Sequence, residues 1–129
     1  MNIRSAFQLK DASQDQVRGS YQRYFASGNY DRRYPSPNPL VLDRLKSLLS
    51  DGGHLIDYGC GSGRYLFALR NRAGCATGFD VSSAALDLLR RRAEAEAWSE
   101  LSICGPEVQD LDTRVAEVGQ ADLLICLFG

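Results

Sequence analysis

The chain has a single histidine, His54, and its four cysteines form no C-x-x-C pair. A histidine-dependent catalytic triad or a zinc site of paired ligands therefore has little to draw on, and we expect no metal. His54 stands at the start of a predicted strand, where a structural role is expected. The cysteines, at positions 60, 75, 104 and 126, lie in strand or loop contexts. Free thiols in a reducing compartment are therefore expected rather than disulfides.

Long apolar runs and extremes of charge are missing as well. No stretch approaches the roughly 18–20 apolar residues that span a bilayer, and residues 1–20 lack the apolar centre of a secretory signal. We therefore expect a cytoplasmic protein without membrane contact. Residues 1–46 carry eight Lys or Arg against four Asp or Glu, a bias too weak to indicate nucleic-acid binding. The length predicts one domain.

The most informative segment, residues 54–63, is an apolar strand that leads into Asp57 and then into three glycines at alternate positions, Gly59, Gly61 and Gly63. Glycine permits a tight turn and a close approach of the backbone to a ligand. A helix is expected over residues 64–72, so free N–H groups at its start would face a nucleotide-like ligand. The dinucleotide fingerprint G-x-G-x-x-G needs a glycine where Arg64 stands, which disfavours a nicotinamide cofactor.

A second acid, Asp80, follows a short apolar run, residues 75–79, which predicts a second strand. A carboxylate about 20 residues beyond such a loop binds ribose hydroxyls in α/β folds, and its two oxygens can accept both hydroxyl protons. Ser82 and Ser83 then cap a helix expected over residues 83–97. The alternative interpretation of Asp80 is that it binds no ligand and is an acid stabilised by the dipole of the helix that follows it.

The rest of the chain extends the alternation of strands and helices. Residues 121–128 form an apolar run after an acid, as expected of a parallel strand covered on both faces. A short third strand is expected near residues 107–109, because Gly105-Pro106 interrupts the preceding run. The pattern predicts an α/β protein with a parallel sheet.

The segment before the first strand is expected to contain two helices. A short helix is predicted over residues 21–29, and the Pro-interrupted segment 30–39 is predicted to be extended. Asn38 then caps a helix that has Pro39 at its first position.

The motif D-x-G-x-G-x-G over residues 57–63 resembles the first motif of class I S-adenosylmethionine-dependent methyltransferases. Asp80, the pair Asp110-Leu111 and the strand after Asp122 follow in the order of that family. The resemblance implies a Rossmann-like fold, S-adenosylmethionine as cofactor and methyl transfer to an acceptor that it does not identify. The loop is also faintly similar to that of methyltransferases acting on tRNA wobble uridine, but a small-molecule acceptor is favoured over tRNA.

The resemblance also implies roles for single residues. The glycine loop with Cys60 would hold the methionine part, Asp80 the ribose, and the carboxyl end of the fourth strand would lie beside the sulfonium. An arginine of the N-terminal segment would pair with the cofactor's carboxylate. The implied cofactor-binding residues are Arg33, Asp57, Gly59, Cys60, Gly61, Gly63, Asp80, Val81, Asp110, Leu111 and Cys126.

The family's sheet has seven strands, whereas this sequence accounts for four, the last of them an apolar edge. We therefore expect the cofactor-binding part of a longer protein, with catalytic residues beyond residue 129. It would comprise an N-terminal arm, residues 1–37, and an incomplete S-adenosylmethionine-binding domain, residues 38–129. Two alternatives stay open, another nucleoside-cofactor transferase and a non-catalytic cofactor-binding module.

Overall fold

A computed structural model describes residues 14–105 and 120–127 of the chain. Three helices come first, α2 (Gln14–Ala26), α3 (Asn29–Arg33) and α4 (Pro39–Leu48). Strands and helices then alternate in the order β1 (Gly53–Tyr58), α5 (Arg64–Leu69), β2 (Ala73–Phe79), α6 (Ser83–Ala95), β3 (Leu101–Cys104) and β4 (Leu123–Ile125). No helix of the described ranges is long and apolar enough to cross a membrane.

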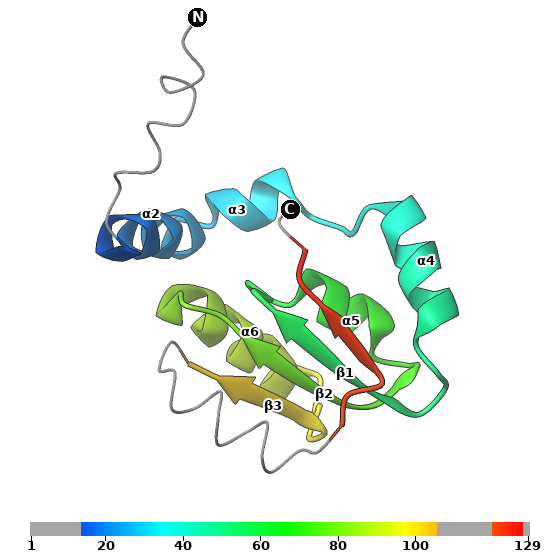
Figure 1. Ribbon diagram of the computed structural model, residues 1–129. Coiled ribbons are helices and arrows are strands. Elements are labelled where there is room, and N and C mark those ends of the chain that lie inside the picture. Colours follow the sequence, from blue (N-terminus) through cyan, green and yellow to red (C-terminus); the bar gives the residue numbers. More distant parts are fainter. Residues whose placement is uncertain (1–13, 106–119, 128–129) are drawn as a thin grey trace, which may run out of the picture.

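The four strands form one parallel sheet in the order β3-β2-β1-β4, which confirms the predicted fold class. In the register, Ile56 of β1 lies opposite Thr77 of β2 and Leu124 of β4. The carboxyl ends of parallel strands meet at one edge of a sheet. The glycine loop and Asp80 therefore emerge side by side, and Figure 1 shows α2 and α3 lying across this edge.

Helices α5 and α6 pack on one face of the sheet, and the larger core cluster lies between them and the strands. Leu55 of β1, Leu66 of α5 and Leu89 of α6 are fully buried in it. Each such side chain contributes roughly 1.5–3 kcal/mol through removal of its apolar surface from water. Successive residues of a strand point to opposite faces, so Ile56 joins a second, smaller cluster on the other side of the sheet.

The start of α4 confirms the predicted cap. The Asn38 side chain accepts hydrogen bonds from the N–H groups of Leu40 and Val41, and Pro39 occupies the first turn. Such a cap stabilises a helix by about 1 kcal/mol. The main-chain N–H of Asn38 also donates to the Tyr65 hydroxyl at 3.2 Å, which ties α4 to α5 beside the glycine loop.

His54 has the structural role that was expected. Its ring Nε2 lies 3.0 Å from Thr77 Oγ1. The main-chain N–H of His54 donates to a carboxylate oxygen of Asp122 at 2.7 Å, and the main-chain carbonyl of His54 accepts from the Asp122 N–H at 3.0 Å. These bonds join the beginning of β1 to its two neighbouring strands. No disulfide joins the four cysteines, all of which lie in the described ranges.

Three predictions about local structure were wrong. The strand after α6 is Leu101–Cys104, which ends before Gly105 rather than beginning after it. Helix α2 begins at Gln14, well before residue 21. Within the segment expected to be extended, Asn29–Arg33 is helical, because Gly28 takes a left-handed conformation, φ 74°, that ends α2 and lets a new helix begin.

Candidate functional site

The loop after β1 turns on three glycines with positive φ, 82° at Gly59, 57° at Gly61 and 95° at Gly63. Residues with a Cβ rarely adopt such angles. A Cβ on Gly61 would stand 2.9 Å from the Phe25 ring, and one on Gly63 would stand 2.4 Å from Leu89. The missing side chains at Gly61 and Gly63 therefore permit α2 and α6 to pack closely against the loop. A Cβ on Gly59 would meet nothing within 4 Å, so Gly59 borders open space.

Four N–H groups of this loop are bonded within the protein. Those of Gly59 and Cys60 both donate to the Phe79 carbonyl, at 2.7 and 2.9 Å. That of Gly63 donates to the Cys60 carbonyl, and that of Gly61 to the Asp80 carboxylate. These N–H groups of the loop itself are therefore occupied, whereas the prediction concerned those at the start of the following helix. Because a pyrophosphate binds to free main-chain N–H groups, the bonded loop suits a cofactor without phosphate better than a dinucleotide.

Asp80 follows β2 and lies beside the glycine loop. One carboxylate oxygen accepts from the Gly61 N–H and the other from the Ser82 N–H, each at 2.8 Å. An ionised carboxylate offers about four lone-pair sites, so each oxygen keeps capacity for one further donor. Asp80 is partly exposed. Two adjacent hydroxyl groups, as in a ribose, match this remaining capacity.

Asp57 lies within β1, close to Asp80 but in a different environment. It is 3% exposed. Burial, and then the Asp80 carboxylate, raise the pKa of Asp57 to about 7, while Arg64 opposes the shift. A cationic group placed beside this carboxyl would favour its ionised form. Burial and the same two carboxylates also raise the pKa of the Cys60 thiol, which makes that residue a packing group rather than a nucleophile.

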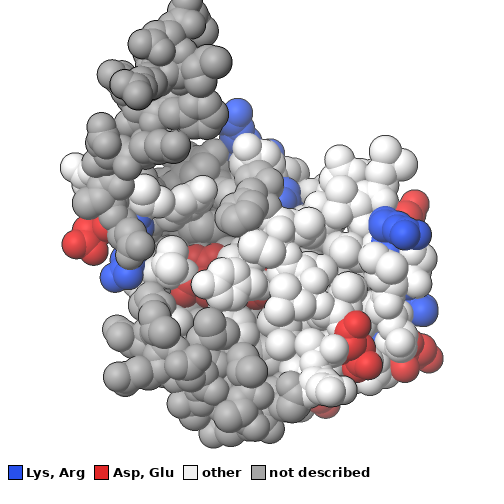
Figure 2. All heavy atoms as spheres, viewed as in Figure 1, with Lys and Arg blue, Asp and Glu red and all other residues white. Residues whose placement is uncertain are grey.

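Residues from three parts of the chain surround a small hollow at Asp57. Its volume is about 10 Å³, room for one water or one small polar group. Figure 2 shows acidic atoms in a recess between the helices at the edge of the sheet and the strands. The hollow is lined by Tyr30, Asp57, Gly59, Cys60, Ser62, Arg64, Tyr65 and Leu127.

Helix α3 covers the hollow with Tyr30, whose ring centroid lies 4.3 Å from that of Phe25 and 5.5 Å from that of Tyr24. Burial raises the pKa of the Tyr30 phenol, and Arg64 opposes that shift. The next residue, Asp31, accepts a hydrogen bond from the Ser62 hydroxyl. The aromatic N-terminal segment thus lies over the glycine loop and is bonded to it.

The structure places Arg33 and Arg64 in different surroundings. Arg33 is exposed, with its guanidinium carbon 5.7 Å from the centre of the Tyr34 ring, and it does not line the hollow at Asp57. Arg64 does line it, and its guanidinium carbon lies 5.3 Å from the Tyr34 ring and 5.1 Å from the Tyr65 ring. The sequence signal for Arg64 is its position directly after the last loop glycine.

The other predicted residues lie along the same edge or outside the described ranges. Val81 follows Asp80 and leaves 46% of its surface exposed, an apolar group beside the carboxylate. Cys126 directly follows β4 and is exposed. Asp110 and Leu111 lie outside the described residues. Within the described ranges, no group of three His, Cys, Asp or Glu could hold a metal ion.

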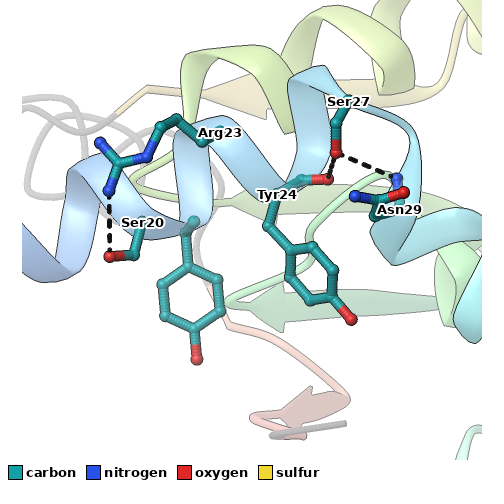
Figure 3. A pocket seen from close by; sticks show the side chains of 6 residues that line it. Ser20, Arg23, Tyr24, Ser27 and Asn29 are labelled. Atoms are coloured by element: carbon teal, nitrogen blue, oxygen red, sulfur yellow. Dashed lines mark hydrogen bonds between the residues drawn. The ribbon is translucent and has the colours of Figure 1, made fainter.

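A larger hollow of about 670 Å³ lies along α2 (Figure 3). Hydrogen bonds within this segment occupy several of its polar groups, with Arg23 donating to Ser20 and the Asn29 N–H to Ser27. The lining residues are Ser20, Tyr21, Arg23, Tyr24, Ser27 and Asn29.

Residues 49–127, more than half of the chain, match the family of methyltransferase domains. The chain therefore belongs to that family. A curated relative, the ubiquinone biosynthesis O-methyltransferase of Coxiella burnetii strain RSA 493 / Nine Mile phase I, is 28% identical over 91 residues. The match covers 70% of this chain, which spans 37% of the relative's length.

Solved structures of similar fold support the architecture. An S-adenosylmethionine-dependent methyltransferase from Thiobacillus denitrificans, in complex with S-adenosylhomocysteine, aligns with TM-score 0.57 at 22% identity, over 82% of this chain and 42% of that one. The [4+2]-cyclase SpnF aligns with TM-score 0.60 at 20% identity, over 74% of this chain and 43% of the SpnF chain. Such similarity shows the Rossmann-like methyltransferase fold. SpnF's name, that of a cyclase, illustrates that the fold alone does not determine the reaction.

Proposed function

We propose that this chain is the cofactor-binding part of an S-adenosylmethionine-dependent methyltransferase. The observation that carries the proposal is the geometry of Asp80. Its two oxygens each hold one main-chain N–H and retain capacity for one hydroxyl group, at the carboxyl end of a parallel strand. Nucleosides bind at this edge of such sheets. Family membership adds methyl transfer as the reaction.

The residues around the hollow fit the remaining parts of such a cofactor. Asp57 would face the amino group of the methionine part, whose positive charge compensates the buried carboxylate. Gly59 would leave room for the chain of the ligand to pass over the loop. Arg64 is better placed than Arg33 to pair with the ligand's carboxylate, because it lines the same hollow as Asp57.

The adenine is assigned to the residues that follow Asp80 and to the segment before β4. Val81 offers exposed apolar surface next to the ribose carboxylate. Asp110 and Leu111, predicted to hold the amino group and the face of the ring, keep that role as part of the proposal. Cys126, directly after β4, is assigned to the part of the site near the sulfonium.

The cofactor, when bound, supplies an electrophilic methyl group. The part of the chain described here binds and orients that donor, and placing a nucleophile in line with the methyl group is largely a matter of proximity. We assign no general base, because none of the described groups is placed for that role by an independent observation. We favour a small-molecule acceptor over tRNA and a cytoplasmic location. The relative's name, which includes ubiquinone biosynthesis, agrees with a small molecule.

Titration calorimetry of the chain with S-adenosylhomocysteine tests the proposal, with NAD as the control ligand. Saturable binding of S-adenosylhomocysteine alone is the expected result. Binding of NAD alone would contradict the cofactor class. A folded sample, by circular dichroism, that binds neither ligand would favour a non-catalytic module that only mediates contacts.

A further inference from the structure

Helix α2 lies behind both main-chain groups that hold the Asp80 carboxylate. Figure 1 shows α2 next to the start of α6. On one side, the Phe25 ring lies against Gly61, within 2.9 Å of where a Cβ would stand, and the Gly61 N–H donates to Asp80. On the other side, Gln22 contacts Ser82, whose N–H donates to the second oxygen of Asp80. One helix of the N-terminal segment therefore supports the carboxylate from two directions.

The contact of Gln22 with the start of α6 uses both ends of its amide. The carbonyl oxygen accepts from the Ser82 hydroxyl and from the Ala84 N–H, each at 3.1 Å, and the amide nitrogen lies 2.9 Å from the Ser83 hydroxyl. The Gln22 side chain is only partly exposed, and Ser82 is completely buried. A side chain 60 positions away in sequence thus supplies an additional cap for α6.

The Ser82 hydroxyl connects these two sets of bonds. Its oxygen accepts from the Ala85 N–H at 3.2 Å, while its single proton goes to Gln22. Without Gln22 this buried hydroxyl would lose its acceptor. A buried donor without a partner costs free energy, so we expect Ser82 to change conformation until its hydroxyl finds another acceptor. Because the hydroxyl and the N–H belong to the same residue, a main-chain shift that brings the Ser82 hydroxyl to a new acceptor would also move the N–H that donates to Asp80.

We propose that Gln22 is a positioning residue for the Asp80 carboxylate and that it acts through Ser82 to hold that carboxylate ready for the two ribose hydroxyls. The inference rests on the proposed function. The inference goes beyond that function because it assigns a role to Gln22, which lies outside residues 49–127, the part of the chain that matches the family. The cofactor site therefore includes the N-terminal segment, although no atom of Gln22 needs to touch the ligand.

Three variants of the full chain separate this role from a merely structural one. Gln22→Met keeps the length of the side chain and removes every hydrogen bond. Gln22→Glu keeps the oxygens that accept from Ser82 and Ala84, loses the donor to Ser83 and adds a negative charge, which the N-terminus of α6 tolerates. Arg23→Met is the matched control, because Arg23 is exposed on the same helix and its guanidinium donates to the Ser20 hydroxyl at 3.5 Å.

The first readout is calorimetry with S-adenosylhomocysteine and with its 2′,3′-dideoxy analogue, which lacks both ribose hydroxyls. We expect Gln22→Met to weaken S-adenosylhomocysteine about tenfold, since hydrogen bonds to a charged group depend on its placement. Affinity for the dideoxy analogue should change less than about twofold. Gln22→Glu and Arg23→Met should stay within about twofold of the wild type for both ligands.

The second readout needs no ligand. In proton–nitrogen correlation spectra, the amide signals of Gly61 and Ser82 should move in Gln22→Met and stay in place in Arg23→Met. Equal weakening of both ligands by Gln22→Met would overturn the inference, because it would show a general structural role. Unchanged binding and unchanged amide signals would overturn it as well. If the wild-type chain does not bind S-adenosylhomocysteine, the proposed function itself fails and the inference fails with it.

Discussion

Asp57 and Asp80 lie at the ends of neighbouring parallel strands, yet the protein treats the two carboxyl groups differently. Asp80 is partly exposed and receives two main-chain hydrogen bonds. Asp57 is almost completely buried, and burial raises its pKa to about 7. The proposed function assigns the hydroxyl groups of a ribose to Asp80 and a positively charged amino group to Asp57. Under the proposed function, two residues of the same type would bind two different parts of one ligand.

The largest effect expected from this contrast concerns stability. Folding raises the pKa of Asp57 from about 4 in the unfolded chain to about 7. Between these two pH values the unfolded chain ionises Asp57 more readily than the folded protein does, so a rise in pH favours unfolding, and the effect levels off above about pH 7. The free energy of unfolding of the wild type should fall relative to Asp57→Asn by about 1.4 kcal/mol per pH unit across that range. Thermal unfolding at pH 4 and pH 8 measures it, with the exposed Asp51→Asn as the control. Parallel curves for wild type and Asp57→Asn would show that Asp57 has an ordinary pKa.

The next effect concerns the ribose. Asp80→Ala removes both proposed bonds to the hydroxyl groups, and hydrogen bonds to a charged group contribute roughly 1.5–3 kcal/mol each. Affinity for S-adenosylhomocysteine should fall at least about a hundredfold. Asp87→Ala, which removes an exposed carboxylate of α6 that pairs with Arg90, is the control. Equal affinities of Asp80→Ala and the wild type in calorimetry would remove the ribose assignment.

A smaller effect links binding to pH. If a cationic amino group lies beside Asp57, that carboxyl must be ionised in the complex, whereas below pH 7 it is mostly protonated in the free protein. Affinity for S-adenosylhomocysteine should therefore rise as the pH increases to about 7, by at most about tenfold per unit, and then level off. Calorimetry at pH 6 in two buffers with different ionisation enthalpies should show proton release. Proton uptake would contradict the assignment, and Asp57→Asn should abolish the dependence.

The smallest effect separates the two arginines. Arg64→Ala removes the charge that opposes the pKa shift of Asp57, so the pKa should rise further and S-adenosylhomocysteine should bind several-fold more weakly. Arg33→Ala removes an exposed guanidinium and should change binding by less than about twofold. A larger loss in Arg33→Ala than in Arg64→Ala would restore Arg33 as the partner of the ligand's carboxylate.

Much of the fold was predictable because its signals are local. The cap at Asn38 and the apolar runs that became β1 and β2 need only neighbouring residues to be recognised. The third strand was misplaced because Gly105-Pro106 was taken as an interruption within a strand region, whereas Leu101–Cys104 is defined by its pairing with β2. Pairing between distant segments leaves little trace in a single sequence.

The site was predictable where a residue belongs to a motif and unpredictable where it depends on packing between distant segments. Asp57, Asp80 and the loop glycines come together as the motif indicated. The surroundings of Arg64, which include Asp57 and Tyr34, depend on packing in space. The internal bonding of the loop N–H groups was also not visible in the sequence, because the Phe79 carbonyl that accepts two of them comes from another strand.

The central claim is that the Asp80 carboxylate holds a ribose diol while it keeps its two main-chain bonds. A crystal structure of the chain with S-adenosylhomocysteine tests it most directly. The account predicts the two ribose hydroxyls within hydrogen-bond distance of the two Asp80 oxygens, with the Gly61 and Ser82 N–H groups still bonded to the same oxygens. A ribose bound elsewhere, or a carboxylate that has left both N–H groups to reach the ligand, would contradict it.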